Sequence, residues 1–489
     1  MEGSWRAKIA KLFLIPQRYV LGIMGFLAIV NAYTMRVSLS VAITEMVAPS
    51  NSTESIDPNA CPVQDDSNST STVTDPDRLY DWDETTQGLI LSSFYWGYAI
   101  THLPGGILAE KFGGKYTLGL GILSTAVFTL ITPWVIHASD GNWVILVVLR
   151  VIEGLGEGTT YPALNALLAK WVPLDERAKM GTLVYAGGQI GTIVSNLISG
   201  SLIHATQDWA SVFYLFGGLG LLWVIIWFLI CYSDPQSHPF IKEEELKYLQ
   251  TELTRVTNDK KTIPWKVILT SVPVWALVAA QVGHDWGFYT MVTDLPKYMK
   301  DVLKFKVNEN GIWSSLPYAV MWIVSMLSGW LCDWLIKKKY CSLTFARKFF
   351  TAVASLGPAV FIIIASFVGC DRMLAVYMFT IAMGFMGTFY CGMKVNALDL
   401  SPNFAGTLMA ITNGIGAIAG IITPYLTGAL TGEHTLEQWR SVLWISFSIF
   451  VVTSIIYTIW GTGEEQWWND PEGRKQQKAE NGETNKEEK

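Results

Sequence analysis

Apolar runs of about 20 residues, long enough to cross a bilayer as single helices, recur along the 489-residue chain. Short polar segments separate them, so hydrophobic and polar stretches alternate from residue 20 to residue 462. This pattern predicts an all-α membrane protein with twelve transmembrane helices. The predicted spans are residues 20–47, 87–109, 117–137, 143–168, 180–204, 211–232, 268–298, 311–333, 349–369, 373–398, 406–430 and 441–462.

Composition supports the same class. The chain is 51% hydrophobic and 16% charged, and its mean hydropathy is +0.31. These values are too apolar for an ordinary soluble domain and are typical of a polytopic membrane protein. The net charge of −6 does not indicate a nucleic-acid or acidic partner, because in a membrane chain the placement of Lys and Arg carries the information.

Basic residues are unevenly distributed between alternate connections. Of 35 Lys and Arg residues, 25 fall in the N-terminus, the even-numbered connections and the C-terminal tail, whereas 7 fall in or at the edges of the odd-numbered connections. Because basic loops stay in the cytosol, both termini are predicted to be cytosolic. Two glycosylation sequons, at Asn51 and Asn68, lie in the loop after the first span, which this topology places outside the cell or in a lumen.

The start of the chain and the cysteines add two expectations. The basic N-terminus runs into an apolar stretch too long for a signal-peptide core and without a small-residue cleavage site, so we expect the first span to be retained. The six cysteines show no metal-ligand spacing. Cys61 and Cys370 lie on the predicted outer side, and whether they form a disulfide stays open.

An internal repeat appears when the chain is compared with itself at an offset of 223 residues. At this offset Gly88 matches Gly311 and Tyr95 matches Tyr318. Further matches continue downstream at slightly larger offsets. Six spans are therefore repeated in the same orientation, which predicts two pseudo-symmetric six-helix halves related by an axis along the membrane normal.

The repeat divides the chain into segments. We expect the linker between the halves to be amphipathic, partly helical and solvated, because it is rich in Glu and Lys. The predicted segments are a cytosolic N-terminus (1–18), a first half (19–232) with a glycosylatable outer loop at about 48–84, the cytosolic linker (233–266), a second half (267–462) and a disordered cytosolic tail (463–489).

The fourth span carries Arg150, Glu153 and Glu157 in an otherwise apolar segment. A charge at the bilayer centre costs roughly 2.5–3.5 kcal/mol on insertion scales, so such residues persist where they line a cavity, pair with one another or move something. On a helix, Glu153 lies about 60° and Glu157 about 20° around the axis from Arg150, so all three are predicted to face one cavity. The matching part of the tenth span carries no charge. We therefore expect the first half to handle charge and coupling, and the second half to supply more of the pocket wall.

These three residues suggest a division of roles. Arg150 can pair with Glu153, and a guanidinium fork fits a carboxylate or phosphate of the substrate. Glu157 has no arginine within one turn, and burial together with the like charge of Glu153 favours its protonated form. We predict that Glu157, with Glu153, is the proton-coupling site. The alternative is a neutral buried acid that is hydrogen-bonded to the backbone.

Arg36 lies near the middle of the first span, where a guanidinium needs an anionic partner. A transported anion is one candidate partner, and a glutamate of the fourth span is the other. A transporter can alternate between the two, so Arg36 is predicted to bind substrate.

Other polar residues are candidates for substrate contacts. His284 and Asp285 are successive residues of the seventh span, so we expect only one of them to face the pocket, and we predict a substrate contact for His284. Lys394 lies near the cytosolic end of the tenth span and is expected to extend toward the interface. Neutral hydrogen bonds to substrate are predicted, with helix packing as the alternative, for Tyr185, Gln189, Tyr289 and Asn413.

The second connection reads Gly105-Gly-Ile-Leu-Ala-Glu110-Lys111-Phe-Gly-Gly-Lys115. It resembles the signature loop of the major facilitator superfamily, with Glu110 where an Asp is usual. Asp333 holds the equivalent position in the repeat. An acid at a helix end beside basic residues can latch two helices, so we predict a cytosolic latch of Glu110, Lys111 and Asp333 that breaks on inward opening. The alternative is a basic loop that only sets topology.

Several motifs carry a closer resemblance: residues 33–40 around Arg36, Ser93-Phe-Tyr-Trp-Gly97, residues 150–158, residues 173–177 and the ending 461–467. Together they resemble the family of sialin, the vesicular glutamate transporters and the type I sodium/phosphate cotransporters, over nearly all of residues 19–470. The resemblance implies anionic substrates. It also implies substrate binding by Arg36, and binding and coupling by Arg150 and Glu157.

Two departures from the vesicular glutamate transporters matter. Their second-span histidine corresponds to Leu91 here, and their seventh-span arginine corresponds to His284. They also carry Gln where this chain has Glu153, whereas the sialin-like pattern has both acids. These differences argue against glutamate-specific transport.

The sequence therefore predicts a secondary active transporter of small anions, such as acidic sugars or amino acids, coupled to H⁺ symport by alternating access. The paired acids of the fourth span favour protons over sodium. The alternative is a Na⁺-dependent inorganic phosphate cotransporter. An anion channel or a non-transporting sensor on the same fold is the alternative from another class, and a continuous conductance would distinguish the channel from a carrier.

No phosphate-cradling loop, zinc-ligand spacing or nucleophile elbow occurs in the sequence. We therefore expect no enzymatic activity, no metal and no cofactor, with H⁺ or Na⁺ as the coupling ion. The expected partners are a small anionic substrate and the lipid bilayer, without nucleic acid, and we expect a monomer. The N-terminus has no evident acidic dileucine sorting signal, which favours the plasma membrane over a lysosomal or vesicular membrane.

Overall fold

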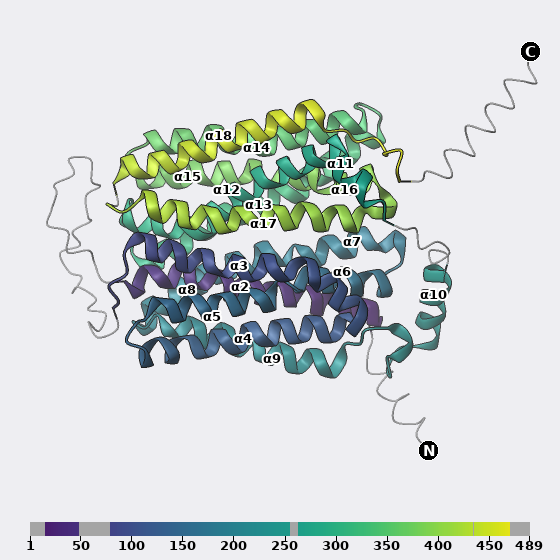
Figure 1. Cartoon of the computed structure of the whole chain (residues 1–489), viewed down its shortest axis with the longest axis horizontal. Coiled ribbons are helices and arrows are strands. Elements are labelled where there is room, and N and C mark those ends of the chain that lie inside the picture. Colours follow the sequence, from purple (N-terminus) through teal and green to yellow (C-terminus); the bar gives the residue numbers. More distant parts are fainter. Residues whose placement is uncertain (1–14, 48–78, 255–262, 434, 470–489) are drawn as a thin grey trace, which may run out of the picture.

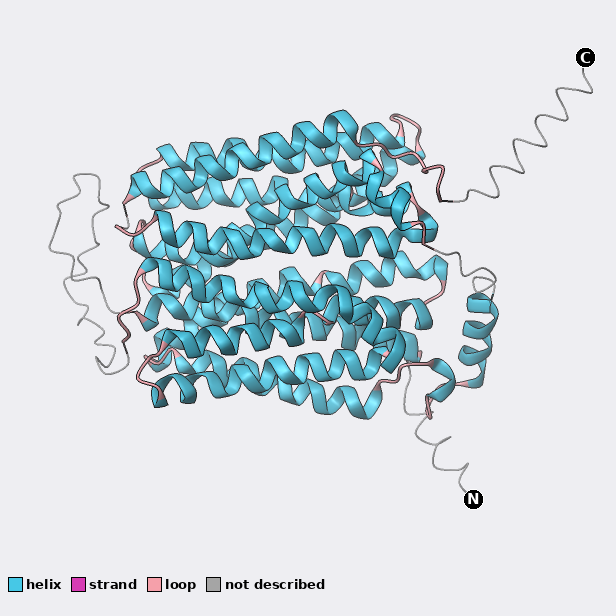
Figure 2. Cartoon of the chain, viewed as in Figure 1, coloured by secondary structure: helices cyan, strands magenta, loops and turns pink. Residues whose placement is uncertain are grey.

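The computed structural model describes residues 15–47, 79–254, 263–433 and 435–469. Within these ranges the chain folds as a bundle of helices without a β-strand (Figure 2). The sequons at Asn51 and Asn68 lie outside the described residues, so their glycosylation stays a prediction.

Eight helical segments in the described ranges are long and apolar enough to cross a membrane. They are α2 (Gln17–Met46), α4 (Gly114–Ala138), α9 (Ala210–Ile230), α13 (Val307–Lys337), α14 (Leu343–Phe367), α15 to α16 (Arg372–Leu400), η4 to α17 (Pro402–Leu430) and α18 (Leu436–Trp460).

Four further segments run beside these eight (Figure 1). They carry most of the polar and ionisable residues of the candidate site, and two of them are divided into shorter helices. Together the two sets confirm twelve transmembrane segments in the part of the chain that is described. The four are α3 (Glu84–Phe112), α5 (Trp143–Glu157) with α6 (Thr160–Trp171), α7 (Leu174–Tyr185) with α8 (Gly187–Thr206), and α12 (Val272–Asp301).

Three spans that the sequence predicts as continuous are interrupted inside the bundle. The fourth breaks at Gly158, between α5 and α6, and the fifth breaks at Ala186, between α7 and α8. The tenth breaks over residues 387–392, where η3 (Gly387–Tyr390) separates α15 (Arg372–Met386) from α16 (Met393–Leu400). Gly158 allows a close approach to α3, because a Cβ there would lie 2.5 Å from the carbonyl oxygen of Tyr98.

The helices form two halves that lie side by side (Figure 1). The first half contains α2 to α9, and the second contains α12 to α18. Between them in sequence, α10 (Glu243–Thr254) lies at one end of the bundle, where the described part of α2 begins and α18 ends. We call this end the terminal face and the opposite end the distal face.

The two halves touch closely near the distal face. A Cβ on Gly88 of α3 would lie 2.4 Å from the carbonyl oxygen of Pro424 on α17, and a Cβ on Gly200 of α8 would lie 2.8 Å from Cα of Gly311 on α13. Such contacts bring backbone against backbone across the boundary. On the terminal side of α17, in contrast, no atom of the described chain outside that helix lies within 4 Å of a Cβ placed on Gly414.

Ion pairs also join the halves at the distal face. Lys297 near the end of α12 pairs with Glu84 at the start of α3, and both side chains are buried. Lys300 lies 3.1 Å from Glu45 of α2. The bundle is therefore closed at the distal face and looser toward the terminal face.

Candidate functional site

The centre of the first half holds an ion pair between two helices. Arg36, midway along α2, pairs with Glu157 at the end of α5, and the two side chains are 3% and 1% exposed. The rings of Tyr33, Phe94 and Tyr98 lie 4.6–4.8 Å from the Arg36 guanidinium carbon. These rings shield the cation from solvent and interact with it through their π faces. Of the two partners left open by the sequence, the fourth-span glutamate is the one present in this structure.

A second ion pair lies beside the first. Arg150 Nη1 lies 2.6 Å from Oε2 of Glu153, as the spacing of three residues predicts, and Arg150 Nη2 donates to the carbonyl oxygen of Arg36 at 3.2 Å. Thr129 of α4 donates to Oε1 of Glu153 at 3.3 Å. Glu153 therefore also contacts α4, and the expectation that it shares one cavity with Glu157 stays a prediction. Its position 60° around the helix from Arg150 is enough to bring its carboxylate to the neighbouring helix.

The four charges balance in two pairs, which is how ionised groups are tolerated in a low-dielectric interior. Two polar atoms of the first pair, Arg36 Nε and Glu157 Oε2, have no hydrogen-bond partner among the described residues. The pair is thus incompletely satisfied. Proton uptake by Glu157 would remove its charge and leave the Arg36 guanidinium available to another anion.

The second half contributes a polar cluster on α12. Oδ1 of Asp285 accepts a hydrogen bond from Gln281 at 2.7 Å and lies 3.2 Å from Nδ1 of His284. The prediction that the two successive side chains point apart is therefore wrong, because the short Asp285 side chain folds back to the imidazole. The His284 ring stacks on Phe389 with centroids 3.5 Å apart. Its Nε2 has no partner within the described residues.

Each half also joins its fourth and fifth spans by a polar pair. In the first half, Tyr185 of α7 donates to Asn165 of α6. In the second, Lys394 of α16 donates to Asn413 of α17 at 2.6 Å. Lys394 therefore does not extend to the terminal face as expected, but turns toward a neighbouring helix inside the bundle.

Two predicted residues make contacts between the halves. Nε2 of Gln189 on α8 donates to the hydroxyl of Tyr390 in η3 at 3.0 Å. The ring of Tyr289 on α12 packs edge-on against Tyr95 of α3, with centroids 4.7 Å apart. Both residues therefore lie at the boundary where a substrate between the halves would sit, and their substrate contacts stay predictions.

The predicted latch is only partly described. Lys111 at the end of α3 and Asp333 on α13 are exposed at the terminal face, whereas the side chain of Glu110 lies outside the described part of the structure. No ion pair within the described residues joins Lys111 to Asp333. The latch therefore stays a prediction.

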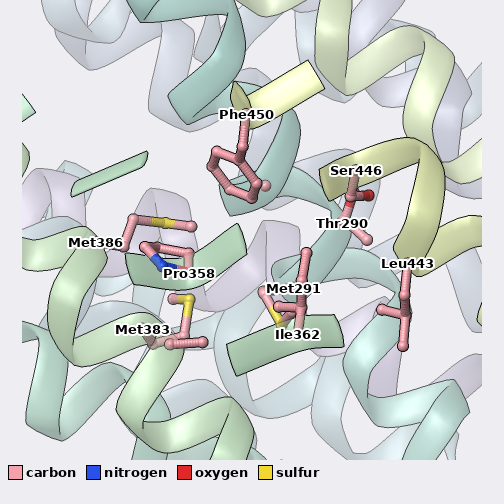
Figure 3. A pocket seen from close by; sticks show the side chains of 11 residues that line it. Thr290, Met291, Pro358, Ile362, Met383, Met386, Leu443, Ser446 and Phe450 are labelled. Carbon is pink, nitrogen blue, oxygen red and sulfur yellow. The ribbon is translucent and has the colours of Figure 1, made fainter. Parts of the chain in front are cut away.

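Figure 3 shows an apolar pocket inside the second half, between α12, α14, α15 and α18. Its lining includes Met291, Met383, Met386 and Phe450, with the hydroxyls of Thr290 and Ser446 as polar groups. No charged side chain lines it. It therefore offers no charged group to an anion.

The cysteines divide into two groups. Cys370 is disulfide-bonded, whereas the thiols of Cys231, Cys332, Cys341 and Cys391 are free. Cys61 lies outside the described residues, so whether it is the partner of Cys370 stays open.

Sequence reasoning missed two features of this region. The first is the set of rings around Arg36, although the spacing of Phe94 and Tyr98 by four residues places them on one helix face. The second is the distal pair of Glu84 and Lys297, because the predicted outer loop includes Glu84 and Lys297 stands at the end of a predicted span. Glu84 and Lys297 have opposite charges, and both stand at predicted outer ends of their helices. This complementarity is a signal that could have suggested the pair.

Comparison with known proteins agrees with this architecture. The model of the Major Facilitator Superfamily matches residues 21–424. Among solved structures, an inward-facing bacterial homologue of the human lysosomal transporter Spinster covers 90% of this chain and 96% of its own, with a TM-score of 0.66 and 14% identity. At that identity the likeness supports the fold alone.

Sequence relatives are closer. Sialin of Homo sapiens is 39% identical over 97% of this chain and 95% of its own. A Drosophila melanogaster protein named "Putative inorganic phosphate cotransporter" is 42% identical over 94% of this chain and 88% of its own. Vesicular glutamate transporter 3 of Danio rerio is 33% identical over 96% of this chain and 77% of its own. The chain is therefore a multi-pass secondary transporter of the major facilitator superfamily, and it belongs to the family that contains these three proteins.

Proposed function

We propose that the protein carries small organic anions together with protons, and that Glu157 is the group that binds the proton. The ion pair of Arg36 and Glu157 supports this proposal. While Glu157 is ionised it occupies the arginine, and when it is protonated it releases the arginine to a substrate carboxylate. Because each event favours the other, the binding of anion and proton is thermodynamically linked.

The way the halves meet supports alternating access. The distal face is closed by the Glu84–Lys297 ion pair and by backbone contacts at Gly88 and Gly200. Rocking of the halves about the central site would open these contacts and close the terminal face. We propose that the terminal face is cytosolic, because the basic residues gather in the connections on that side.

Sodium-driven uptake of inorganic phosphate is the second candidate. It is favoured by the 42% identity to the Drosophila melanogaster relative. The guanidinium of Arg36 suits a phosphate as well as a carboxylate, because both present two acceptor oxygens to its fork. In that case Glu157 would act as a partner of Arg36 without carrying the coupling ion.

Uptake into proteoliposomes tests the proposal. Labelled phosphate, glucuronate, sialic acid, glutamate and urate would be offered under an imposed pH gradient or an imposed sodium gradient. We expect saturable uptake of an organic anion that is driven by the pH gradient, and loss of that drive in Glu157→Gln. Phosphate uptake driven only by sodium would support the second candidate, and a continuous anion conductance would support a channel.

A further inference from the structure

Lys394 is a basic residue in the interior of the second half. The tenth span breaks before it, so α16 (Met393–Leu400) begins inside the bundle and Lys394 stands in its first turn. Six residues separate it from the end of the helix, which corresponds to about 9 Å of helix rise. The ammonium group is therefore set back from the terminal face.

The contacts of Lys394 leave its charge without a direct counter-ion. Its Nζ donates to the neutral amide of Asn413 at 2.6 Å and lies 5.9 Å from the ring of Phe389. No carboxylate oxygen of the described chain lies within 4 Å of it. By contrast, other basic residues within the described spans do pair directly with a carboxylate. They are Arg36, Arg150, Lys297 and Arg347.

Asp285 on α12 is the acid of the neighbouring polar cluster, but no ion pair joins it to Lys394 within the described residues. Oδ1 is engaged by Gln281 and His284. Oδ2 packs against α17, where a Cβ on Gly416 would lie 2.1 Å from it. An ammonium carries three donors, and Asn413 accepts one, so donors of Lys394 remain for a ligand.

Two buried imidazoles of the bundle also have unused polar atoms. Nε2 of His284 and Nδ1 of His102 have no hydrogen-bond partner among the described residues, and the two residues are 6% and 5% exposed. The His102 ring packs on Tyr98, with centroids 5.2 Å apart, and Tyr98 lies against the Arg36 guanidinium. The His284 ring stacks on Phe389, the same ring that Lys394 approaches. Each half thus holds an imidazole atom without a partner in the surroundings of its buried cation.

The repeat shows that this cation is specific to one half. Helices α5 and α15 have 15 residues each, and the offset of 229 residues that superposes their sequences carries Asn165 onto Lys394. Asn165 accepts a hydrogen bond from the fifth span, whereas Lys394 donates one to the eleventh. The second half thus places a cation where the first half has a neutral amide.

We propose that Lys394 is a second anion-binding residue, which holds the substrate on the terminal-face side of Arg36. Its ligand is a small oxyanion, either a carboxylate or a phosphate group, whose oxygens replace the missing counter-ion. Half-burial of Lys394 beside the looser terminal side of the bundle gives that anion access. This inference rests on the anion transport proposed above and adds a residue to its binding site.

Substitution of Lys394 tests the proposal. Initial uptake rates would be measured against anion concentration in proteoliposomes, with inorganic phosphate and glucuronate as separate probes. Lys394→Asn restores the residue of the first half, and Lys394→Arg keeps the charge. Lys338→Asn is the control, because Lys338 is exposed at the terminal face of the same half.

We expect Lys394→Asn to raise KM about tenfold or more, the size of effect that follows loss of a charge-assisted hydrogen bond, with a smaller change in kcat. Lys394→Arg should stay within about threefold of the wild-type KM, and the control should be unchanged. The probe with the larger KM change identifies the preferred oxyanion. If Lys394→Asn has the same KM as the wild-type protein, the proposal is overturned, although the transport function itself can stand.

A second measurement separates binding from folding. The shift in thermal unfolding temperature caused by the transported anion would be measured on purified protein, with Lys394→Gln as an additional variant. Unliganded variants should unfold near the wild-type temperature but gain less stability from the anion. An equal gain in unfolding temperature on anion binding in all variants would contradict the role of Lys394. A wild-type protein that transports neither probe nor any other anion would overturn the proposed function as well.

Discussion

The Arg36–Glu157 pair makes a quantitative prediction about stability, which can be tested apart from transport. Both side chains are almost completely buried, and they come from different helices. We consider three proteins: Arg36→Gln, Glu157→Gln and the double variant. If the pair is ionised in this structure, each single variant leaves a buried group without its counter-ion, whereas the double variant leaves two neutral amides.

The expected losses are unequal. Removal of one partner of a buried ion pair costs about 3–5 kcal/mol. Arg36 cannot lose its proton under ordinary conditions, so Glu157→Gln should carry that full loss. In Arg36→Gln the remaining Glu157 can take up a proton and become neutral, so the loss should be smaller and should shrink further between pH 8 and pH 5. The double variant should recover at least about 1 kcal/mol relative to the sum of the singles.

Thermal unfolding of the purified protein measures these differences. For a unit of 150–250 residues, which is the size of the first half, 1 kcal/mol shifts the unfolding temperature by about 2–4 °C. Glu157→Gln should therefore unfold roughly 6–20 °C below wild type if the half unfolds as a unit. Equal losses in both single variants at every pH, with additive behaviour in the double variant, would refute an ionised pair.

Three further predictions concern other parts of the fold. Lys297→Gln breaks the buried pair with Glu84 and should open the distal face, so spin-label distances between α3 and α17 should lengthen; an unchanged distance distribution would contradict this. Gly88→Leu should reduce uptake at least about tenfold by keeping the distal face from closing, whereas Gly218→Leu, at a site with nothing within 4 Å, should transport normally. Burial lowers the pKa of His238 in the linker, where Nδ1 accepts a backbone N–H. When the linker is released, His238 binds a proton near its ordinary pKa of about 6.5, whereas in the packed linker it does not. Packing should therefore weaken as the pH falls through that value. Hydrogen exchange at residues 233–241 should then increase, and His238→Gln should remove this pH dependence.

Much of the architecture could be predicted from the sequence, because it depends on local or repeated patterns. Membrane-length apolar runs predicted the spans, and the repeat of Gly88 and Tyr95 in the second half predicted two related halves. The Arg150–Glu153 pair was predictable as well, since residues three apart lie on one helix face.

What the sequence left open depends on contacts between helices. The partner of Arg36 could be a substrate or a glutamate, because nothing along the chain reveals which side chain of α5 faces α2. The interruption at Gly158 was missed because the fourth span reads as apolar on both sides of it. Lys394 was assigned to the interface for the same reason, since a continuous tenth helix would have placed it near the end of the span.

In the proposed coupling, a proton moves with the anion through Glu157. The most direct test adds a transported anion to the outside of proteoliposomes that contain a trapped pH-sensitive dye, with no imposed gradient. We expect acidification of the lumen by the wild-type protein, at a rate that saturates with anion concentration, and none by Glu157→Gln. Anion uptake by the wild-type protein without acidification, and with dependence on sodium, would contradict it.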